Sequence, residues 1–379
     1  MKASYYFLLM ICVLLLSCNR EVKKDGLIEI AVDIDQNFSL PLSEIADETI
    51  AIELELTSES LINPDRIQSV LLTEDVVIMS EADKIFAFDN NGKFVRTIGS
   101  KGQGPGEFTG IRLIAVDNKN KYVYVIALIN KIICYDLTTG NFLKESYQTQ
   151  QLAQIKSIRY INDEFLLLSE QSGNDEKGLF KLSALYRLNR EFQIADSVII
   201  RMNHFGQAFR FATRSDGDFI LSCNSNLYVY CPENYPDMSM SSQFQVNPSE
   251  VVLRDTLYRL ENNFLIPELK LKFKNNGIDE GGNKFISLYN IYRSSRYIFA
   301  YYRNSLNKNN EYLFCYDTKT GKGYNMQSGY TDDIHNIEKR VSIRPLNTDT
   351  EVFYYWHTNM KPGDKEEPNP TLYIGKLKK

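Results

Sequence analysis

The side chains best suited to bind a ligand are three arginines, Arg66, Arg112 and Arg159, each near the predicted start of a β-strand. A guanidinium group can hold a carboxylate or an anionic sugar through paired, charge-assisted hydrogen bonds. If these strands line a channel, the arginines would face its interior or its entrance and form an anion-binding site. The alternative is that each arginine forms a salt bridge with a neighbouring part of the fold.

A second candidate is Trp356, the only tryptophan of the chain, which lies in the aromatic run of residues 353–357. A glycan or a peptide can stack on an indole ring, so Trp356 could be part of a ligand-binding surface. The same run also fits an inner β-strand whose aromatic side chains fill the space between packed sheets. The sequence leaves both interpretations open.

Motifs of nucleophilic and metal-dependent catalysis are absent from the sequence. The chain has neither a Gly-x-Ser-x-Gly elbow nor a His-Glu-x-x-His motif, and its three histidines are scattered. The glycine-rich residues 99–106 lack the Lys and Ser/Thr of a phosphate loop, and we interpret them as a sharp crossover held in place by Glu107. The sequence therefore assigns no catalytic residue, no metal and no cofactor, and it favours a binding protein over an enzyme.

The elements that must position these residues are β-strands. Tyr and Phe number 24 and 21, and short apolar runs alternate with turns rich in Asn, Asp and Gly. Residues 85–94, 132–142 and 312–322 share one pattern: a strand, an Asp, a Gly and a return strand. Asp can hydrogen-bond the turn backbone, and Gly can adopt a positive φ. Cys134 and Cys315 occupy equivalent positions in two copies, which predicts small packing residues rather than reactive thiols.

Weaker copies extend this repeat to six turn positions, which are 47 to 72 residues apart: Asp89, Asp136, Asn189, Glu261, Asp317 and Lys376. A four-stranded propeller blade needs about 40 to 50 residues, so each interval fits one blade with insertions. The repeat therefore predicts an all-β, six-bladed β-propeller over residues 31–379. Residues 49–56 alternate apolar and polar side chains, and we expect them to pair into the last blade and close the ring. Two stacked β-sandwich domains are the alternative.

Two polar segments fall between the predicted strands. We expect residues 232–248 to form a long insertion in the fourth blade and residues 361–370 to extend the sixth. Cys223 and Cys231 flank a predicted hairpin. Neither a two-residue turn at 225–226 nor a three-residue loop would bring the two sulfur atoms within bonding distance, so we expect buried free thiols.

The composition limits the partners of the chain. Its formal net charge is −5 at pH 7 and its pI is about 5.5, whereas binding to nucleic acid requires concentrated positive charge. We therefore expect no nucleic-acid partner. Residues 5–16 are the only long uncharged apolar run, so the N-terminus is the one predicted contact with a membrane.

The N-terminus has the layout of a secretory signal: a positive charge, the apolar residues 5–16, then small residues. The run is too short for a stable membrane span. Its Leu-Leu-Ser-Cys ending resembles the lipobox of bacterial lipoproteins. The resemblance implies that a signal peptide of residues 1–17 is removed, that Cys18 carries several acyl chains such as palmitate, and that residues 18–30 form a polar tether. Asn19 in place of Asp favours the outer membrane and leaves its periplasmic or surface side open.

Residues 88–99 and 102–108, the latter reading Gly-Gln-Gly-Pro-Gly-Glu-Phe, resemble the signature of six-bladed β-propeller lipoproteins of Bacteroidetes. Those proteins are in turn distantly similar to NHL-repeat propellers. Residues 255–260 resemble another segment of the same family. The resemblance implies the fold and a location in the cell envelope, but it carries no established activity.

Together these features predict a lipid-anchored envelope propeller that binds a glycan, a peptide or a protein partner such as transport machinery, without chemistry of its own. The alternative is a lyase or hydrolase acting on sugars or peptides. That alternative requires carboxylates, Arg and Tyr to converge at the channel mouth, with at least one perturbed pKa. A third hypothesis, an assembly scaffold, requires a broad apolar patch on one face.

Overall fold

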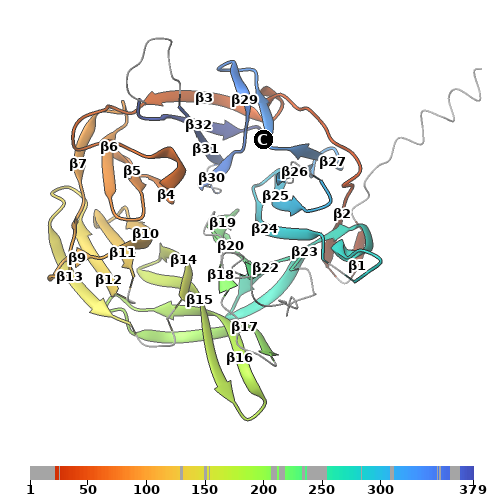
Figure 1. The fold of residues 1–379 in the computed structure, drawn as a ribbon, viewed down its shortest axis with the longest axis horizontal. Helices are drawn as coiled ribbons and strands as arrows, with labels where there is room; N and C mark the ends of the chain where they lie inside the picture. Colours follow the sequence, from red (N-terminus) through yellow and green to blue (C-terminus); the bar gives the residue numbers. More distant parts are fainter. Residues whose placement is uncertain are drawn as a thin grey trace, which may run out of the picture.

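The computed structural model describes residues 22–24, 26–128, 131–148, 152, 154–205, 211–212, 218–232, 235–236, 254–282, 284–307, 311–347, 349, 351–358 and 368–379. Six sheets surround a central axis and form a six-bladed β-propeller (Figure 1), which confirms the predicted fold. The predicted signal peptide and Cys18 lie outside the described residues, as do most of the two expected insertions.

Blades 1 to 3 each contain four antiparallel strands, placed in chain order from the axis outward. Blade 1 consists of β4 (Ser69–Leu72), β5 (Val76–Ser80), β6 (Ile85–Asp89) and β7 (Phe94–Thr97). Blade 2 consists of β10 (Ile111–Asp117), β11 (Tyr122–Ala127), β12 (Lys131–Asp136) and β13 (Phe142–Tyr147). Blade 3 consists of β14 (Gln154–Ile161), β15 (Glu164–Asp175), β16 (Gly178–Leu188) and β17 (Ile194–Phe205), and its long β15–β16 hairpin projects beyond the ring (Figure 1).

Blades 4 to 6 complete the ring. Blade 4 contains β19 (Ile220–Cys223), β20 (Asn226–Tyr230), β22 (Thr256–Glu261) and β23 (Phe264–Phe273). Blade 5 contains β24 (Ile286–Arg293), β25 (Tyr297–Asn304), β26 (Glu311–Asp317) and β27 (Lys322–Gln327). Blade 6 contains β30 (Arg344–Asn347), β31 (Val352–His357), β32 (Thr371–Leu377) and, outermost, β3 (Ala46–Glu53).

Smaller elements connect the blades. Three two-stranded sheets are formed by β8 (Ser100–Lys101) with β9 (Glu107–Phe108), β18 (Phe211–Ala212) with β21 (Tyr235–Pro236), and β28 (Tyr330–Asp332) with β29 (Ile337–Val341). Short 3₁₀ helices occur at η1 (Leu42–Glu44), η2 (Pro64–Arg66) and η5 (Lys274–Gly277). Among the described residues, no helix combines the length and the apolar character needed to cross a bilayer.

Each predicted turn position lies at or next to the end of the third strand of a blade. In blade 1, the Asp89 carboxylate accepts a hydrogen bond from the amide of Asn91 at 2.8 Å, and Gly92 has a φ of +85°. In blade 2, the Asp136 carboxylate accepts one from the amide of Thr139 at 2.7 Å. The third strands are nearly continuous in apolar residues because neighbouring blades cover both of their faces. This burial made the strand–turn unit recognisable in the sequence.

The ring is closed by β3, which pairs antiparallel with β32 and places Ile52 opposite Leu372. This confirms the prediction for residues 49–56, although the strand begins at Ala46. Ile52 is 4% exposed and Ile50, two residues earlier on the same face of β3, is 57% exposed, so this face is buried at Ile52 and open to solvent at Ile50. Strands from the two ends of the domain therefore share one blade.

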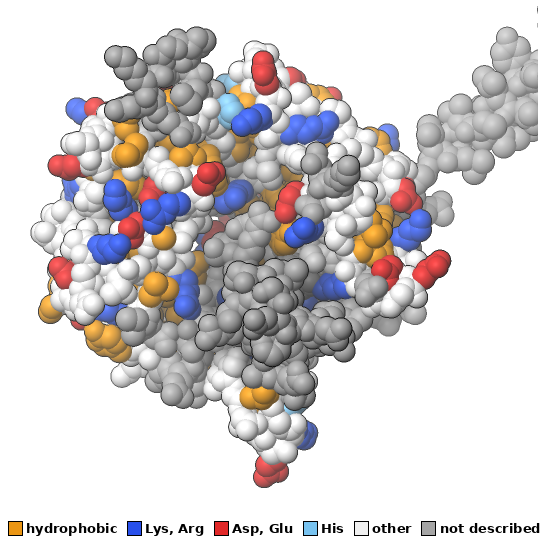
Figure 2. All heavy atoms as spheres, viewed as in Figure 1, with side chains coloured by type: hydrophobic (Ala, Val, Ile, Leu, Met, Phe, Trp, Pro, Cys, Tyr) orange, Lys and Arg blue, Asp and Glu red, His pale blue; other side chains and the backbone are white. Residues whose placement is uncertain are grey.

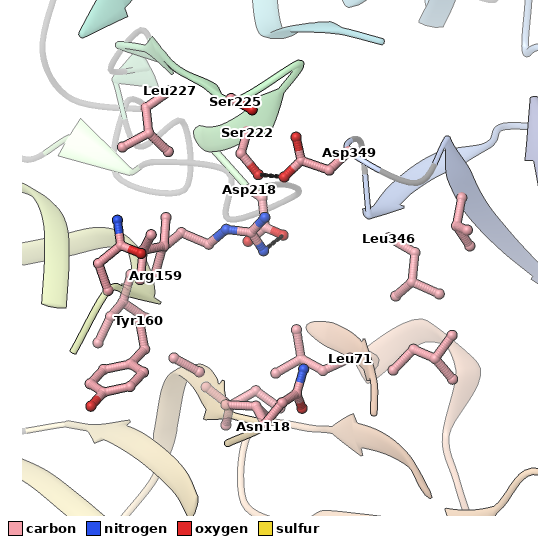
Figure 3. Close-up of a pocket in the computed structure, with 18 residues that line it drawn as sticks. Leu71, Asn118, Arg159, Tyr160, Asp218, Ser222, Ser225, Leu227, Leu346 and Asp349 are labelled. Carbon is pink, nitrogen blue, oxygen red and sulfur yellow. Dashed lines mark hydrogen bonds and ion pairs between the residues drawn. The ribbon is translucent and has the colours of Figure 1, made fainter. Parts of the chain in front are cut away.

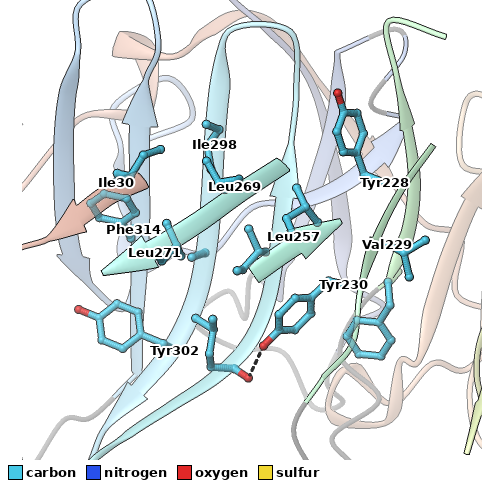
Figure 4. Close-up of a cluster of buried hydrophobic side chains, with 14 of the residues drawn as sticks. Ile30, Tyr228, Val229, Tyr230, Leu257, Leu269, Leu271, Ile298, Tyr302 and Phe314 are labelled. Atoms are coloured by element: carbon cyan, nitrogen blue, oxygen red, sulfur yellow. Dashed lines mark hydrogen bonds between the residues drawn. The ribbon is translucent and has the colours of Figure 1, made fainter. Parts of the chain in front are cut away.

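Apolar clusters fill the spaces between neighbouring blades. The largest joins blades 3, 4 and 5 and includes Leu185, Val229, Leu269 and Phe314 (Figure 4). Full burial of a large apolar side chain contributes about 1.5 to 3 kcal/mol, so packing between blades is the main source of stability. A single blade leaves both of its faces uncovered, which is why the fold requires a closed ring.

Two cysteines of the repeat lie inside these clusters, as predicted. Cys134 packs between blades 2 and 3, and Cys315 packs between blades 5 and 6. Burial raises the pKa of the Cys134 thiol to about 11 and that of Cys315 to about 12. Both side chains are therefore neutral at physiological pH and behave as small hydrophobic residues.

The hairpin between Cys223 and Cys231 has a register that differs from both predicted ones. Asn224 and Ser225, which have positive φ, form a two-residue turn, so Cys223 lies opposite Asn226. The predicted turn one residue later was wrong because Asn224 itself adopts the left-handed conformation that the turn requires. The expectation of free, buried thiols is confirmed for both cysteines.

The glycine-rich loop between blades 1 and 2 is held by Glu107, as predicted. The Glu107 carboxylate accepts a hydrogen bond from the amide of Gly104 at 2.8 Å, and the Tyr135 hydroxyl donates to the carbonyl of Gly106 at 2.7 Å. Gly106 has a φ of +69°, and a Cβ atom there would lie 2.5 Å from the ring of Phe142. A residue with a side chain would therefore strain this crossover.

The chain before β3 runs around the outside of the ring from blade 4 across blade 5 to blade 6 (Figure 1). Two strands, β1 (Val22–Lys24) and β2 (Leu27–Val32), extend blade 4, where β2 pairs in parallel with β23 and places Ile28 opposite Leu269. The chain then crosses the outer strand of blade 5, where the Phe38 amide donates to the carbonyl of Asn325 at 2.7 Å. We name residues 27–45 the N-terminal strap. The strap overlaps the range 18–30 in which a polar tether was expected.

Candidate functional site

A cavity of about 570 Å³ lies at one end of the central channel (Figure 3). Its walls come from the innermost strands β4, β10, β14, β19 and β30 and the turns that follow them, from Asp218 before β19, and from the starts of β20 and β31. Blade 5 contributes none of the described lining residues, which are Leu71, Leu72, Ile114, Ala115, Val116, Asn118, Ile158, Arg159, Tyr160, Ile161, Asn162, Asp218, Ser222, Ser225, Leu227, Leu346, Asp349 and Val352.

The lining combines apolar and polar side chains. Leu71 and Leu346, from blades 1 and 6, lie on one side of the cavity, and Arg159, Asp218 and Asp349 lie on the other (Figure 3). Such a mixed lining is typical of sites in which apolar contact provides affinity and a few polar groups fix the orientation of a ligand. The cavity volume also lies within the range of small-molecule pockets, about 300 to 1,000 Å³.

Arg159 of β14 and Asp218, which precedes β19, form an ion pair across blades 3 and 4. The Arg159 Nη1 atom lies 3.8 Å from the Asp218 Oδ2 atom, and both side chains remain partly exposed. Burial raises the pKa of the Asp218 carboxyl, and the charge of Arg159 opposes part of that rise. The pair is loose enough for a ligand to exchange hydrogen bonds with either partner.

Ser222 and Asp349 join two blades that are not neighbours. The Ser222 hydroxyl of β19 donates a short hydrogen bond to the carboxylate of Asp349, which lies in the turn between β30 and β31. This contact links blade 4 to blade 6 in front of the inner edge of blade 5. It explains why blade 5 contributes none of the described lining residues.

Tyr160 presents its ring to the cavity, but its hydroxyl is directed away from Arg159 and Asp218 (Figure 3). The hydroxyl donates to the Asp163 carboxylate at 3.4 Å. Burial, together with the neighbouring Asp117, raises the pKa of Tyr160 to about 12. Tyr160 is therefore neutral at physiological pH and is placed to stack on a ligand rather than to exchange protons with one.

The structure does not bring the three predicted arginines together. Arg66, at the end of η2, pairs with Asp83 at 3.0 Å. Arg112 of β10 is half-buried, which lowers its pKa, and it does not line the cavity. Only Arg159 lines the cavity. A ligand-binding role of Arg66 or Arg112 stays a prediction.

Trp356 lies in β31, on the side of blade 6 that packs against blade 1. The guanidinium carbon of Arg344 lies 4.6 Å from the centre of its ring, and the ring of Tyr354 is stacked at 6.0 Å. These neighbours match the packing role that was the alternative to glycan stacking. A ligand-binding role for Trp356 also stays a prediction.

Sequence analysis missed Asp218, Ser222 and Asp349. These residues do not belong to the repeated third strand that revealed the blades, and Ser222 and Asp349 are 127 positions apart. One signal was available. Each first-to-second strand turn of a propeller lies at the same face, so grouping the polar residues of those turns could have found Asp349. Asp218 precedes β19 and Ser222 lies within it, so this signal does not mark them.

The surface in Figure 2 carries Lys, Arg, Asp and Glu side chains that are interspersed, and its apolar side chains lie in small separate groups. The described part of this face therefore lacks the broad apolar patch that an assembly scaffold requires. Across the described ranges, no group of three or more His, Cys, Asp or Glu side chains is arranged to hold a metal ion.

Six blades form a closed ring around a channel, and a cavity lies at the mouth of this channel. The protein is therefore a β-propeller with a candidate ligand pocket. The chain belongs to the family described as "Domain of unknown function (DUF4934)", whose model matches residues 26–379. The match begins immediately before β2, so the strap is part of the family domain.

Among solved structures, a crystal structure of a Bacteroides fragilis protein named "putative exported protein" is similar to this chain. Its TM-score is 0.58 at 16% identity, over 93% of this chain and 99% of that chain. The Neurospora crassa Pan2 WD40 domain has a TM-score of 0.42 at 11% identity, over 83% of this chain and 76% of that chain. At these identities the likeness to the Bacteroides protein shows the fold alone. No curated protein matches the chain.

Proposed function

We propose that this protein is a propeller of the cell envelope that is anchored by lipid on Cys18 and binds a small polar ligand in its central cavity. The cavity, which combines apolar side chains with Arg159, Asp218, Ser222 and Asp349, is the observation that carries the proposal. The lipobox-like sequence at residues 15–18, together with the name of the similar Bacteroides fragilis protein, supports export. Asn19 favours the outer membrane.

The ligand class that fits best is a short glycan or a peptide. Both present hydroxyl or amide groups that can exchange hydrogen bonds with carboxylates and a guanidinium, and both also present apolar surface. Tyr160 and Leu346 offer the apolar contact on opposite sides of the cavity. The Asp218 and Asp349 carboxylates outnumber the Arg159 cation among the described charged lining residues. This disfavours the anionic ligand that three converging arginines would have bound.

The proposal is tested by calorimetry of the purified chain with panels of short glycans and peptides. The matched variants are Leu72→Trp, which places an indole in the cavity, and Val95→Trp on β7 of the same blade. Leu72 and Val95 are 37% and 40% exposed, so both sites should tolerate the larger ring. Loss of binding in the Leu72 variant alone would support the cavity, and equal binding in both variants would exclude it.

A second candidate function, hydrolysis or elimination at the same cavity, is favoured by one observation. Asp218 is a carboxyl with a raised pKa that faces a cavity also lined by the carboxyl of Asp349. A carboxyl with a raised pKa is better suited to act as a general acid. Turnover of a bound glycan or peptide that disappears in Asp218→Asn while binding persists would replace the binding proposal. Unchanged ligand after long incubation would exclude the enzyme.

A further inference from the structure

The N-terminal chain joins the ring at the rim of blade 4, and this attachment limits how the propeller can stand on a membrane. β1 begins at Val22, so only residues 19–21 separate it from Cys18. We propose that the rim of blade 4 rests on the lipid bilayer, with the channel axis parallel to the membrane plane. The inference rests on the proposed acylation of Cys18 and adds an orientation to it.

The segment that links Cys18 to β1 is short, so it limits how far the acyl chains can lie from blade 4. Four residue steps from Cys18 to Val22 span at most roughly 14 Å when fully extended. β1 is hydrogen-bonded to β2, and β2 is hydrogen-bonded to β23 at the periphery of the ring (Figure 1). The acylated residue therefore stays close to blade 4 and cannot reach the opposite rim, where blade 1 lies.

Exposed apolar side chains on the same outer strand provide a second contact point. Phe264 and Ile266 of β23 are 72% and 36% exposed. They precede the part of β23 that pairs with β2, which begins at Leu269, so they lie at another level along the strand. β23 runs between the two faces of the ring. A bilayer that touches both the β1–β2 hairpin and Phe264 is therefore tangent to the rim.

Two lysines in the described part of this rim add no strong attraction to anionic lipid, because each is paired with a carboxylate. Lys272 of β23 pairs with Glu29 of β2 at 2.5 Å, and Lys274 pairs with Asp35 of the strap at 3.1 Å. Neutralised lysines contribute little to binding at a negative surface. Acyl chains and apolar side chains then supply the contact, so vesicle association should persist at high salt.

This orientation has a functional consequence for the cavity. The cavity opens at one end of the channel, and neither end of the channel faces the bilayer when the ring stands on its rim. A soluble ligand can then enter from the side, parallel to the membrane surface. A ring lying on its cavity face would instead exclude such a ligand.

The test uses the acylated full chain on vesicles of phosphatidylethanolamine and phosphatidylglycerol that contain brominated lipid. Variants with one introduced cysteine, at sites of matched exposure, carry a fluorophore: Ile266→Cys on the blade 4 rim, Val95→Cys on the blade 1 rim and Leu72→Cys at the cavity mouth. The described native cysteines form no disulfide and are buried, so the label reacts at the introduced thiol. We expect severalfold stronger quenching at position 266 than at positions 95 and 72.

The outcomes separate the orientation from the anchor. Flotation with the vesicles and equal quenching at positions 266 and 95 would overturn the orientation and leave the anchor standing. Strongest quenching at position 72 would show a ring lying on its cavity face, which also overturns it. A chain that does not float, and whose Cys18→Ser variant behaves identically, would refute the anchor itself and with it this inference. Phe264→Asp should reduce quenching at position 266 while flotation persists.

Discussion

Ring closure by β3 makes a quantitative prediction about two isoleucines of the same strand. Ile52 is buried against Leu372 between blades 6 and 1, and Ile50 lies two residues earlier with its side chain in solvent. Ile52→Ala removes three carbon atoms from the core, a transfer loss of about 2 kcal/mol. The cavity that remains brings the cost to about 2 to 5 kcal/mol. Ile50→Ala removes the same atoms from an exposed site and should cost less than about 0.5 kcal/mol.

Trp356 provides the assay for this prediction. It is the only tryptophan, and it pairs with Leu372, the residue opposite Ile52. Urea unfolding followed by its fluorescence therefore reports directly on the closing blade. If the two alanine variants lose the same stability, or if Ile52→Ala loses none, the buried contact of Ile52 with the last blade does not stabilise the closed ring.

Three further predictions concern single contacts. Gly375→Ala should destabilise the fold by about 1 to 3 kcal/mol in urea unfolding, because the new Cβ atom would lie 2.3 Å from the ring of Phe353. Glu107→Ala should lower the stability by about 1 kcal/mol, measured in the same way, because the glycine-rich loop loses its carboxylate acceptor. At Asp317, burial raises the pKa, but hydrogen bonds from Arg296 outweigh it and hold the pKa below 3.8. That carboxylate stabilises the fold above pH 3.8, and the contribution is lost as the pH falls through the folded-state pKa; Arg296→Gln should flatten this part of the acid-unfolding curve.

Each of these three predictions has a control. Phe353→Leu should recover part of the stability lost in Gly375→Ala, and no recovery would mean that the clash is not the cause. Glu107→Gln keeps an acceptor and should lose less than the alanine variant, so equal losses would contradict the role of the hydrogen bond. An acid-unfolding curve of Arg296→Gln that is parallel to the wild-type curve would contradict the assignment at Asp317.

The fold was predictable because its signal is local. The turn at Asp89 and the crossover at Glu107 depend on hydrogen bonds to residues within four positions, so the sequence displays them directly. The third strands are buried on both faces, which requires a continuous apolar run. The alternation over residues 49–56 likewise reveals a strand, and Ile52 and Leu54 on its apolar face are buried. These features need no knowledge of distant partners.

The cavity was not predictable in the same way, because its polar groups come from blades that are far apart in the chain. Arg159 was identified as a candidate, but its partner Asp218 lies 59 positions later. Arg66 was identified on the same grounds, yet it pairs with Asp83 on the surface. Residue type and spacing cannot distinguish an arginine that faces a cavity from one that pairs with a nearby carboxylate. Only the folded ring shows which arginine faces the cavity.

The N-terminal strap also determines how the protein responds to mechanical force. A pull on the N-terminus acts first on β1 and β2 at the edge of blade 4 and then on the contact of Phe38 with blade 5. Only after these have detached does it reach the seam between β3 and β32. A force that pulls the membrane anchor away from a bound ligand would therefore detach the edge strands first, while the ring and its cavity keep their shape.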